Sequence, residues 1–176
     1  MAEAFIGLGS NLGDGCANIL AAWQYLGSMT GIEPAELSSP YRTAPEGFSS
    51  ANWFTNAVCR LQTTLSCRDL LAAMLQAETT MGRVREINET VPTDRIVDLD
   101  LLYYDDLVLS EPDLIIPHPD IQERLFVLVP LAELAADMVH PVLGLTSRQL
   151  RDDLLGLSMS GEAEAAVQKM SWQDRG

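Results

Sequence analysis

The sequence predicts an α+β protein with the ferredoxin-like fold, a βαββαβ antiparallel sheet with additional C-terminal helices. Three observations lead to this prediction. Apolar stretches of strand type and helix type follow one another in the order strand, helix, strand, strand, helix, strand, which is the order of that fold. Both helix-type stretches begin at a residue that commonly caps helices. Further apolar segments with helical spacing follow the last strand.

The first half of the chain predicts three strands and one helix. An apolar run is followed by a cluster of glycine, asparagine and aspartate, which indicates a strand, a loop and then a helix from near Asp14 to about Ser28. Two alternating stretches come next, and the loop between them has a length that is usually functional or mobile. The predicted strands occupy residues 2–8, 32–42 and 53–63.

The second half predicts one capped helix, two strands and two more helices. Ser66 caps a helix that keeps its apolar period until Gly82. The polar stretch 86–94 has no periodicity, and we interpret it as a candidate lid. After the first strand we expect a tight turn, a short strand, and a helix that is broken or begins near Pro130. The segments are strand 95–104, turn 105–106, strand 107–110 and helices 124–136 and 147–155.

Asp98 and Asp100 lie within an otherwise apolar strand. Because side chains alternate along a strand, both carboxylates point to one face, while Val97, Leu99 and Leu101 point to the other. Two like charges so close repel each other and lose hydration, and a hard divalent cation such as Mg²⁺ would relieve both costs. The pair alone leaves an alternative open, in which both aspartates lie on a wet face and bind arginine or water.

Composition indicates an ordinary globular protein. The chain has 176 residues, 47% of them hydrophobic and 20% charged, so we expect one domain over 1–176 with a frayed tail from about 157 to 176. No apolar run is long enough to span a membrane and no signal pattern is present, which predicts a cytoplasmic protein without a membrane partner. Cys16, Cys59 and Cys67 have neither disulfide-framework nor zinc-site spacing.

The charge distribution indicates a local anion site in an acidic protein. The net charge of −14 argues against a nucleic-acid surface. The sequence leaves the oligomeric state open, with a monomer slightly favoured. Arginine suits bidentate phosphate contacts, so cations concentrated in one part of the chain could hold a polyphosphate. For Arg60 and Arg68, pairing with surface acids is the simpler interpretation. The arginines in the middle of the chain are Arg42, Arg60, Arg68, Arg83, Arg85, Arg95 and Arg124.

Two further polar residues have both a structural and a functional interpretation. Asn56 lies within a predicted strand, where asparagine is uncommon unless its amide is used, and it could also be exposed on the solvent face. His118 lies between two prolines that keep its backbone extended. A single histidine of this kind is more often hydrogen-bonded within the structure than catalytic.

Taken together, six motifs resemble the 6-hydroxymethyl-7,8-dihydropterin pyrophosphokinases of folate biosynthesis. The resemblance covers about residues 4–145, and the order of the motifs makes it more specific than any one of them. The motifs are GLGSNLGD at 7–14, SSPYRTAPEG at 38–47, FTNAV at 54–58, E-x3-GRVR at 78–85, DRIVDLDLLYY at 94–104 and IPHPDIQERLFVLVPL at 116–131.

The resemblance implies transfer of the pyrophosphoryl group of ATP to the hydroxymethyl oxygen of the pterin, with release of AMP. By motif, Asp98 and Asp100 correspond to the ligands of two Mg²⁺ ions. Residues implied to be catalytic or to contact ATP are Arg83, Arg95, Asp98, Asp100, Glu78, Arg85, His118 and Arg124. Residues implied to form the pterin pocket are Thr43, Ala44, Phe54, Asn56 and Phe126.

The chain departs from the family pattern near the candidate lid. The family usually has Gly-Pro before the arginine that corresponds to Arg95, and an Arg-Trp pair in the preceding loop. This chain has Thr93 and Asp94 there, the loop is longer and acidic, and Glu46 replaces a small or apolar residue. Two alternatives stay open: a non-catalytic binding module with a similar sheet, and a metal nucleotidyl transferase that releases pyrophosphate.

Overall fold

The structure, a computed structural model, combines an antiparallel β-sheet with four α-helices among the residues that it describes, which are 1–45, 50–83, 93–157 and 167–173. The main sheet has the strand order β5-β1-β4-β3-β8, and β2 also pairs with β4. The strands are β1 (Ala2–Ser10), β2 (Ile32–Leu37), β3 (Tyr41–Thr43), β4 (Phe54–Thr63), β5 (Asp98–Tyr104) and β8 (Val167–Lys169). The helices are α1 (Gly15–Ser28), α2 (Cys67–Thr80), α3 (Leu125–Ala135) and α4 (Ser147–Leu157).

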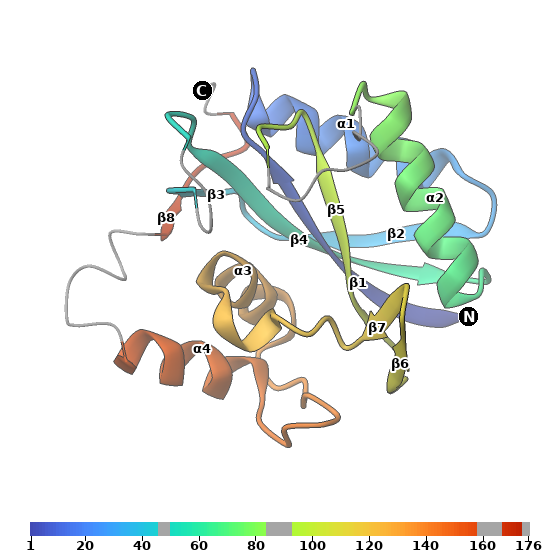
Figure 1. The fold of residues 1–176 in the computed structure, drawn as a ribbon, viewed down its shortest axis with the longest axis vertical. Helices are drawn as coiled ribbons and strands as arrows, with labels where there is room; N and C mark the ends of the chain where they lie inside the picture. The colour runs from blue at the N-terminus through green and yellow to red at the C-terminus, as the bar shows by residue number, and fades with distance from the viewer. Residues whose placement is uncertain (46–49, 84–92, 158–166, 174–176) are drawn as a thin grey trace.

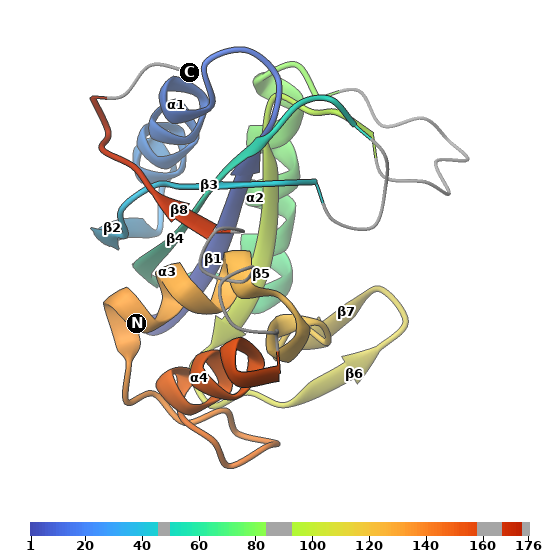
Figure 2. The ribbon, with the colours of Figure 1, turned by 90° about the vertical axis from the view of Figure 1, so that its left-hand side faces the viewer.

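The helices cover the sheet from two sides (Figures 1 and 2). Helices α1 and α2 pack on one face, where Ile6, Leu61 and Leu101 belong to the core cluster that also contains Ile19 and Met74. Helices α3 and α4 cover part of the other face through a second cluster. Its buried members include Phe5, Val58, Tyr103, Leu128, Leu131 and Leu150. Because alternate residues of β1 and β4 enter different clusters, both faces of these central strands are buried along much of their length.

Both predicted helix starts have side-chain caps. The carboxylate of Asp14 accepts a hydrogen bond from the Ala17 amide at 3.0 Å, and the Ser66 hydroxyl accepts one from the Asp69 amide at 3.2 Å. Each bond satisfies an amide that has no partner within the helix. Pro130 lies inside α3, which continues through it instead of breaking or starting there.

The predicted strand 32–42 is two strands, β2 and β3, which both pair with β4. Two features separate the strands. The Ser38 hydroxyl accepts a hydrogen bond from the Val58 amide at 3.0 Å, and Pro40 has no backbone N–H group to donate to a neighbouring strand. The short strand predicted at 107–110 is β6 (Leu109–Glu111), and it forms a separate hairpin with β7 (Leu114–Ile116), which the sequence did not indicate.

Part of the tail that was expected to be frayed is ordered. Strand β8 pairs antiparallel with β3, with Val167 opposite Thr43 and Lys169 opposite Tyr41. Met170 extends the contact, because its amide donates to the carbonyl of Pro40 at 2.8 Å. Figure 2 shows β8 beside β3 at the edge of the sheet. Among the described residues, no helix is long and apolar enough to cross a membrane.

Candidate active site

A cavity of about 520 Å³ lies on the sheet face that α3 and α4 leave partly open. It collects residues from β1, β3, β4, β5 and the start of α3, so distant parts of the chain meet there. Ten of the predicted site residues line it: Thr43, Ala44, Phe54, Asn56, Arg95, Asp98, Asp100, His118, Arg124 and Phe126. Glu78 and Arg83 are not among its lining residues, and Arg85 lies outside the described residues, as do Glu46 and most of the candidate lid.

Two glycines of β1 form part of the cavity wall beside the carboxylates. Gly9 pairs with Asp98 on one side and with Asn56 on the other, and Gly7 pairs with Asp100. A Cβ atom at Gly9 would lie 3.0 Å from the Asn56 side-chain oxygen. The missing side chain therefore lets the carboxylates of β5 and the amide of β4 face the same space.

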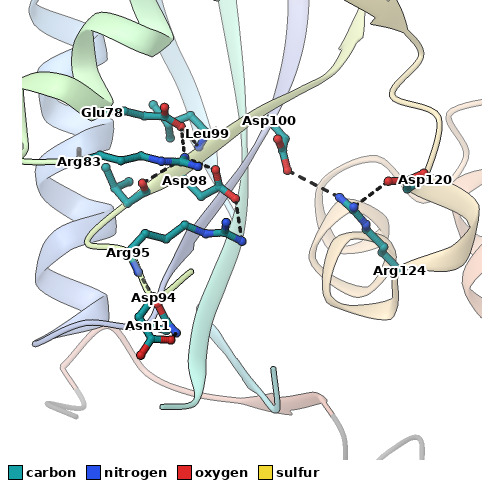
Figure 3. A network of polar contacts seen from close by, with 11 residues as sticks. Asn11, Glu78, Arg83, Asp94, Arg95, Asp98, Leu99, Asp100, Asp120 and Arg124 are labelled. Atoms are coloured by element: carbon teal, nitrogen blue, oxygen red, sulfur yellow. Dashed lines mark hydrogen bonds and ion pairs between the residues drawn. The ribbon is translucent and has the colours of Figure 1, made fainter. Parts of the chain in front are cut away.

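Asp98 and Asp100 share one face of β5, as the alternation predicted, while Val97, Leu99 and Leu101 are buried in the α1–α2 core. Their partners differ (Figure 3). The Asp98 carboxylate binds Arg83, and its second oxygen lies 3.2 Å from a guanidinium nitrogen of Arg95.

Asp100 is held more loosely than Asp98. Among the described residues its ion-pair partner is Arg124, at 3.8 Å, and Arg124 is itself bound to Asp120 at 2.6 Å. Burial and then the charge of Asp98 raise the pKa of Asp100, while His118 and Arg124 lower it. The site therefore has a carboxylate whose ionised form would gain from an additional positive charge.

Glu78 lies behind the carboxylates, with 1% of its surface exposed. One of its oxygens accepts hydrogen bonds from the Leu99 amide at 2.8 Å and from Arg83 at 2.7 Å. These donors offset the cost of an acid near the C-terminal end of α2. Glu78 and Arg83 thus connect α2 to β5 and orient Asp98 from behind, a role that only their spatial positions reveal.

The cavity wall opposite Asp98 and Asp100 carries aromatic rings and the side-chain amide of Asn56. Asn56 is 5% exposed, so the interpretation that it lies on the solvent face is wrong. Its side-chain NH₂ group donates to the Thr43 hydroxyl at 2.8 Å, which joins β4 to β3. Phe54 and Phe126 lie under the guanidinium groups of Arg95 and Arg124, at 5.5 Å and 5.7 Å from the ring centroids. These rings offer flat apolar faces next to a polar edge.

His118 is hydrogen-bonded within the structure and also lines the cavity. Its amide donates to the Leu102 carbonyl at 3.0 Å, and its ring nitrogen Nδ1 accepts from the Asp120 amide at 3.2 Å, so it is held within the structure. It also lines the cavity. Asp120 and Glu123 line the same cavity and were not singled out from the sequence. The spacing of Asp120 four residues before Arg124 is a signal that could have identified their ion pair.

The carboxylate pair has the chemistry for a hard cation. In the described part of the chain, no group of three or more histidine, cysteine, aspartate or glutamate side chains could hold a metal ion by itself. Two carboxylates at an open cavity fit Mg²⁺, which usually takes one or two protein carboxylates and completes its shell with water and phosphate oxygens. The surrounding arginines suit the same phosphates. By contrast, Arg60 and Arg68 pair with surface acids, as expected.

Comparisons with known proteins point to one family. The sequence model of the family described as 7,8-dihydro-6-hydroxymethylpterin-pyrophosphokinase (HPPK) matches residues 5–136. A 2-amino-4-hydroxy-6-hydroxymethyldihydropteridine pyrophosphokinase from Methylorubrum extorquens is 39% identical over 161 residues, which are 92% of this chain and 97% of that protein. Its counterpart from Synechocystis is 41% identical over 84% of this chain and 73% of that protein.

Solved structures agree on the fold. Wild-type HPPK-DHPS from Plasmodium falciparum, solved with pteroate, superposes with a TM-score of 0.77 at 14% identity. The superposition covers 96% of this chain and 47% of that one, so this chain corresponds to about half of the larger protein.

Paired carboxylates and arginines around one cavity are typical of enzymes that hold and transfer phosphoryl groups. Within that class the comparisons are specific, because the family's sequence model spans most of the chain and a relative of nearly the same length is 39% identical. The chain belongs to the HPPK family.

Proposed function

We propose that this protein transfers the pyrophosphoryl group of ATP to the hydroxymethyl oxygen of 6-hydroxymethyl-7,8-dihydropterin in folate biosynthesis. The observation that carries the proposal is the cavity itself. Asp98 and Asp100 lie on one side, Phe54 and Asn56 lie on the other, and Arg95 reaches between Asp98 and Phe54. One cavity thus offers a place for a charged triphosphate and a place for a flat heterocycle. Membership of the HPPK family supports the same assignment.

The ATP side is assigned to the acidic and basic residues. Asp98 and Asp100 would hold two Mg²⁺ ions, which neutralise triphosphate charge when bound. Arg95 and Arg124 reach the cavity and would bind phosphate oxygens. The remaining residues assigned to ATP binding, in contact or from behind, are His118, Glu78, Arg83 and Arg85.

The pterin side is assigned to the aromatic and amide wall. Phe54 and Phe126 offer ring faces for stacking, and Asn56 can read the edge of the heterocycle. Thr43 and Ala44 would close the pocket from β3 and the loop that follows it. Since Asn56 already donates to Thr43, its side-chain oxygen is oriented independently of the ligand and is available to accept from a ring N–H group.

The proposed reaction needs positioning and charge stabilisation more than covalent help. The pterin hydroxyl oxygen forms a bond to the β-phosphorus of ATP, and the hydroxyl releases its proton to water. The bond from that phosphorus to the bridging oxygen of the α-phosphate breaks. AMP leaves with the electron pair of that bond. The cavity residues would hold the two substrates in line and stabilise the charge that spreads over the transferring group.

We also propose that the chain is one pyrophosphokinase domain with ferredoxin-like topology. The strand order β5-β1-β4 with β2 and β3 outside β4, and the antiparallel pairing throughout, support this classification. Fold class by itself carries no function.

The test is incubation with ATP, Mg²⁺ and the hydroxymethyldihydropterin, followed by chromatography of the products. AMP and a pyrophosphorylated pterin are expected in equal amounts, and both should disappear when a chelator removes Mg²⁺. Release of pyrophosphate would indicate a nucleotidyl transferase instead. Nucleotide binding that needs no Mg²⁺ and yields no product would indicate a binding module.

A further inference from the structure

Asp94 connects three segments of the chain at the edge of the active-site cavity. One carboxylate oxygen accepts from the side-chain NH₂ group of Asn11 at 2.6 Å and from the Ser50 hydroxyl at 2.6 Å. The other oxygen accepts from the side-chain NH₂ group of Asn52 at 2.7 Å. Asn11 follows β1, Ser50 and Asn52 precede β4, and Asp94 precedes β5. One carboxylate therefore links loop residues that lie next to the ends of three neighbouring strands, β1, β4 and β5.

Asn11 transmits this contact to the backbone of Arg95. Its side-chain oxygen accepts a hydrogen bond from the backbone amide of Arg95 at 2.7 Å. The backbone amide of Asn11 donates to the Arg95 carbonyl at 3.1 Å. Asn11 is only 7% exposed, so these bonds are largely shielded from competing water. Together with the Asp94 bond, they hold residues 94 and 95 from both sides (Figure 3).

The position of Arg95 matters because its guanidinium lies between the two halves of the cavity. It is 3.2 Å from Asp98 and stacks over the Phe54 ring at 5.5 Å. Its Nε atom is buried and has no hydrogen-bond partner among the described residues. The side chain thus has few polar contacts of its own, and the fixed backbone determines where it enters the cavity.

The three bonds to Asp94 occupy both of its carboxylate oxygens without neutralising its charge. All three donors are neutral, and an ionised carboxylate accepts without donating. The hydrogen bond from Ser50, followed by those from Asn52 and Asn11, lowers the pKa of Asp94. An amide at this position keeps one acceptor oxygen, which can serve Asn11 and Ser50, and turns its NH₂ group toward the side-chain amide of Asn52.

We propose that Asp94 is a positioning residue for Arg95: it holds the approaches to β1, β4 and β5 together so that the Arg95 guanidinium lies between Asp98 and Phe54. The proposal rests on the pyrophosphoryl transfer proposed above, in which Arg95 binds phosphate. Asp94 itself does not line the cavity, so its effect on catalysis passes through Arg95.

The test reverses the polarity of one hydrogen bond. Asp94→Asn should lower kcat by about tenfold while changing the KM for the pterin by less than about twofold. The reason is that Arg95, which is proposed to bind phosphate, would be displaced, and this affects mainly the transition state. Adding Asn52→Asp to Asp94→Asn restores a donor opposite an acceptor and should recover most of kcat. Asn52→Asp alone places two carboxylates together and should also lower kcat. Asp106→Asn, an exposed isosteric change outside the active-site cavity, is the matched control.

A second measurement does not depend on activity. Hydrogen exchange at the Arg95 amide should accelerate in Asp94→Asn and return toward the wild-type rate in the double variant. Wild-type kinetics and exchange in Asp94→Asn would overturn the proposal, as would a double variant no better than the single ones. A loss of kcat that merely follows a lower melting temperature would also overturn it. If the wild-type protein itself released no AMP, the proposed function would fail, and the exchange result would still decide how Arg95 is held.

Discussion

At the scale of single residues, the two aspartates of β5 have different environments despite sharing one face. Asp98 is bound by two arginines, whereas Asp100 has one distant cationic partner and a raised pKa. Removing Asp98 would leave Arg83 and Arg95 without their shared partner, which is costly for charges that are mostly buried. Removing the charge of Asp100 would relieve repulsion. The two substitutions should therefore have similar effects on catalysis and different effects on folding.

Asp100→Asn should reduce turnover by more than about a hundredfold, since loss of a proposed metal ligand would cost several kcal/mol of barrier. Its melting temperature without ligands should equal or exceed that of the wild type. Asp98→Ala should lose turnover and also melt at a lower temperature. Product chromatography and thermal unfolding measure the two effects, with Asp106→Asn as the control. Wild-type turnover by Asp100→Asn would refute its assignment as a metal ligand.

Asn56→Ala should weaken pterin binding and leave ATP binding nearly unchanged. The substitution leaves the Thr43 hydroxyl and the edge of the heterocycle without a partner in a buried pocket, at a cost of about 1–3 kcal/mol. Calorimetry with each ligand separately measures the difference. Gln62→Ala, on the same strand but outside the cavity, is the control. An equal loss of both ligands would indicate a folding defect instead of a lost contact.

At the scale of elements, strand β8 supports the side of the cavity that is proposed to bind the pterin. Strand β3 has only three residues, and it is paired with β4 on one side and β8 on the other. Its last residue, Thr43, lines the cavity and accepts from Asn56. Lys169 also lies 3.5 Å from Glu133 of α3, and Glu133 accepts from Tyr41 at 2.6 Å. A segment far along the chain thus fixes the strand that carries Thr43.

Truncation after Leu157, which removes β8, should raise the dissociation constant of the pterin by roughly threefold to tenfold, because β3 becomes an edge strand with fewer bonds to order it. The affinity for an ATP analogue should change less. Calorimetry on the truncated and full-length proteins tests this, and truncation after Gln173 is the control. Unchanged pterin affinity with a stable fold would show that β8 has no part in the pocket.

At the scale of the whole molecule, the protein is acidic, with a net charge of −14, yet its proposed substrate ATP is an anion. Arg95 and Arg124 line the cavity beside Asp98 and Asp100 and would provide positive charge for it. Stability against pH depends on buried groups more than on net charge. Burial lowers the pKa of His140, whose ring packs edge-on against Tyr103 and accepts from the Val142 amide at 3.2 Å.

Stability should fall as the pH decreases from about 7.5 to 5.5, with His140 contributing to the loss. A lowered folded-state pKa means that the unfolded chain takes up the proton first, so protonation favours unfolding as the pH falls through the unfolded value of about 6.5 and beyond. His140→Gln should make stability less dependent on pH over this range. Urea unfolding of the wild type and the variant at both pH values measures it. Parallel pH dependence in the two proteins would contradict the assignment to His140.

Local sequence patterns predicted most of the elements and most of the cavity. Alternation along β5 placed both aspartates on one face, and Asp14 and Ser66 marked the helix starts, because these features depend on neighbouring residues only. Ten of the residues that the family motifs predicted for the site line one cavity. The separation of β2 from β3 was missed because it depends on Ser38 binding a distant strand.

The sequence by itself determined the order of the elements, the shared face of Asp98 and Asp100, and the family to which the chain belongs. Tertiary structure alone decided that Glu78 supports Asp98 from behind, that Asp94 joins three approaches to the cavity, and that β8 completes the sheet beside Thr43. The physical reason is the range of the interactions. Periodicity and capping act within a few residues, whereas these contacts join residues that are distant in the chain and come together only when the sheet has formed.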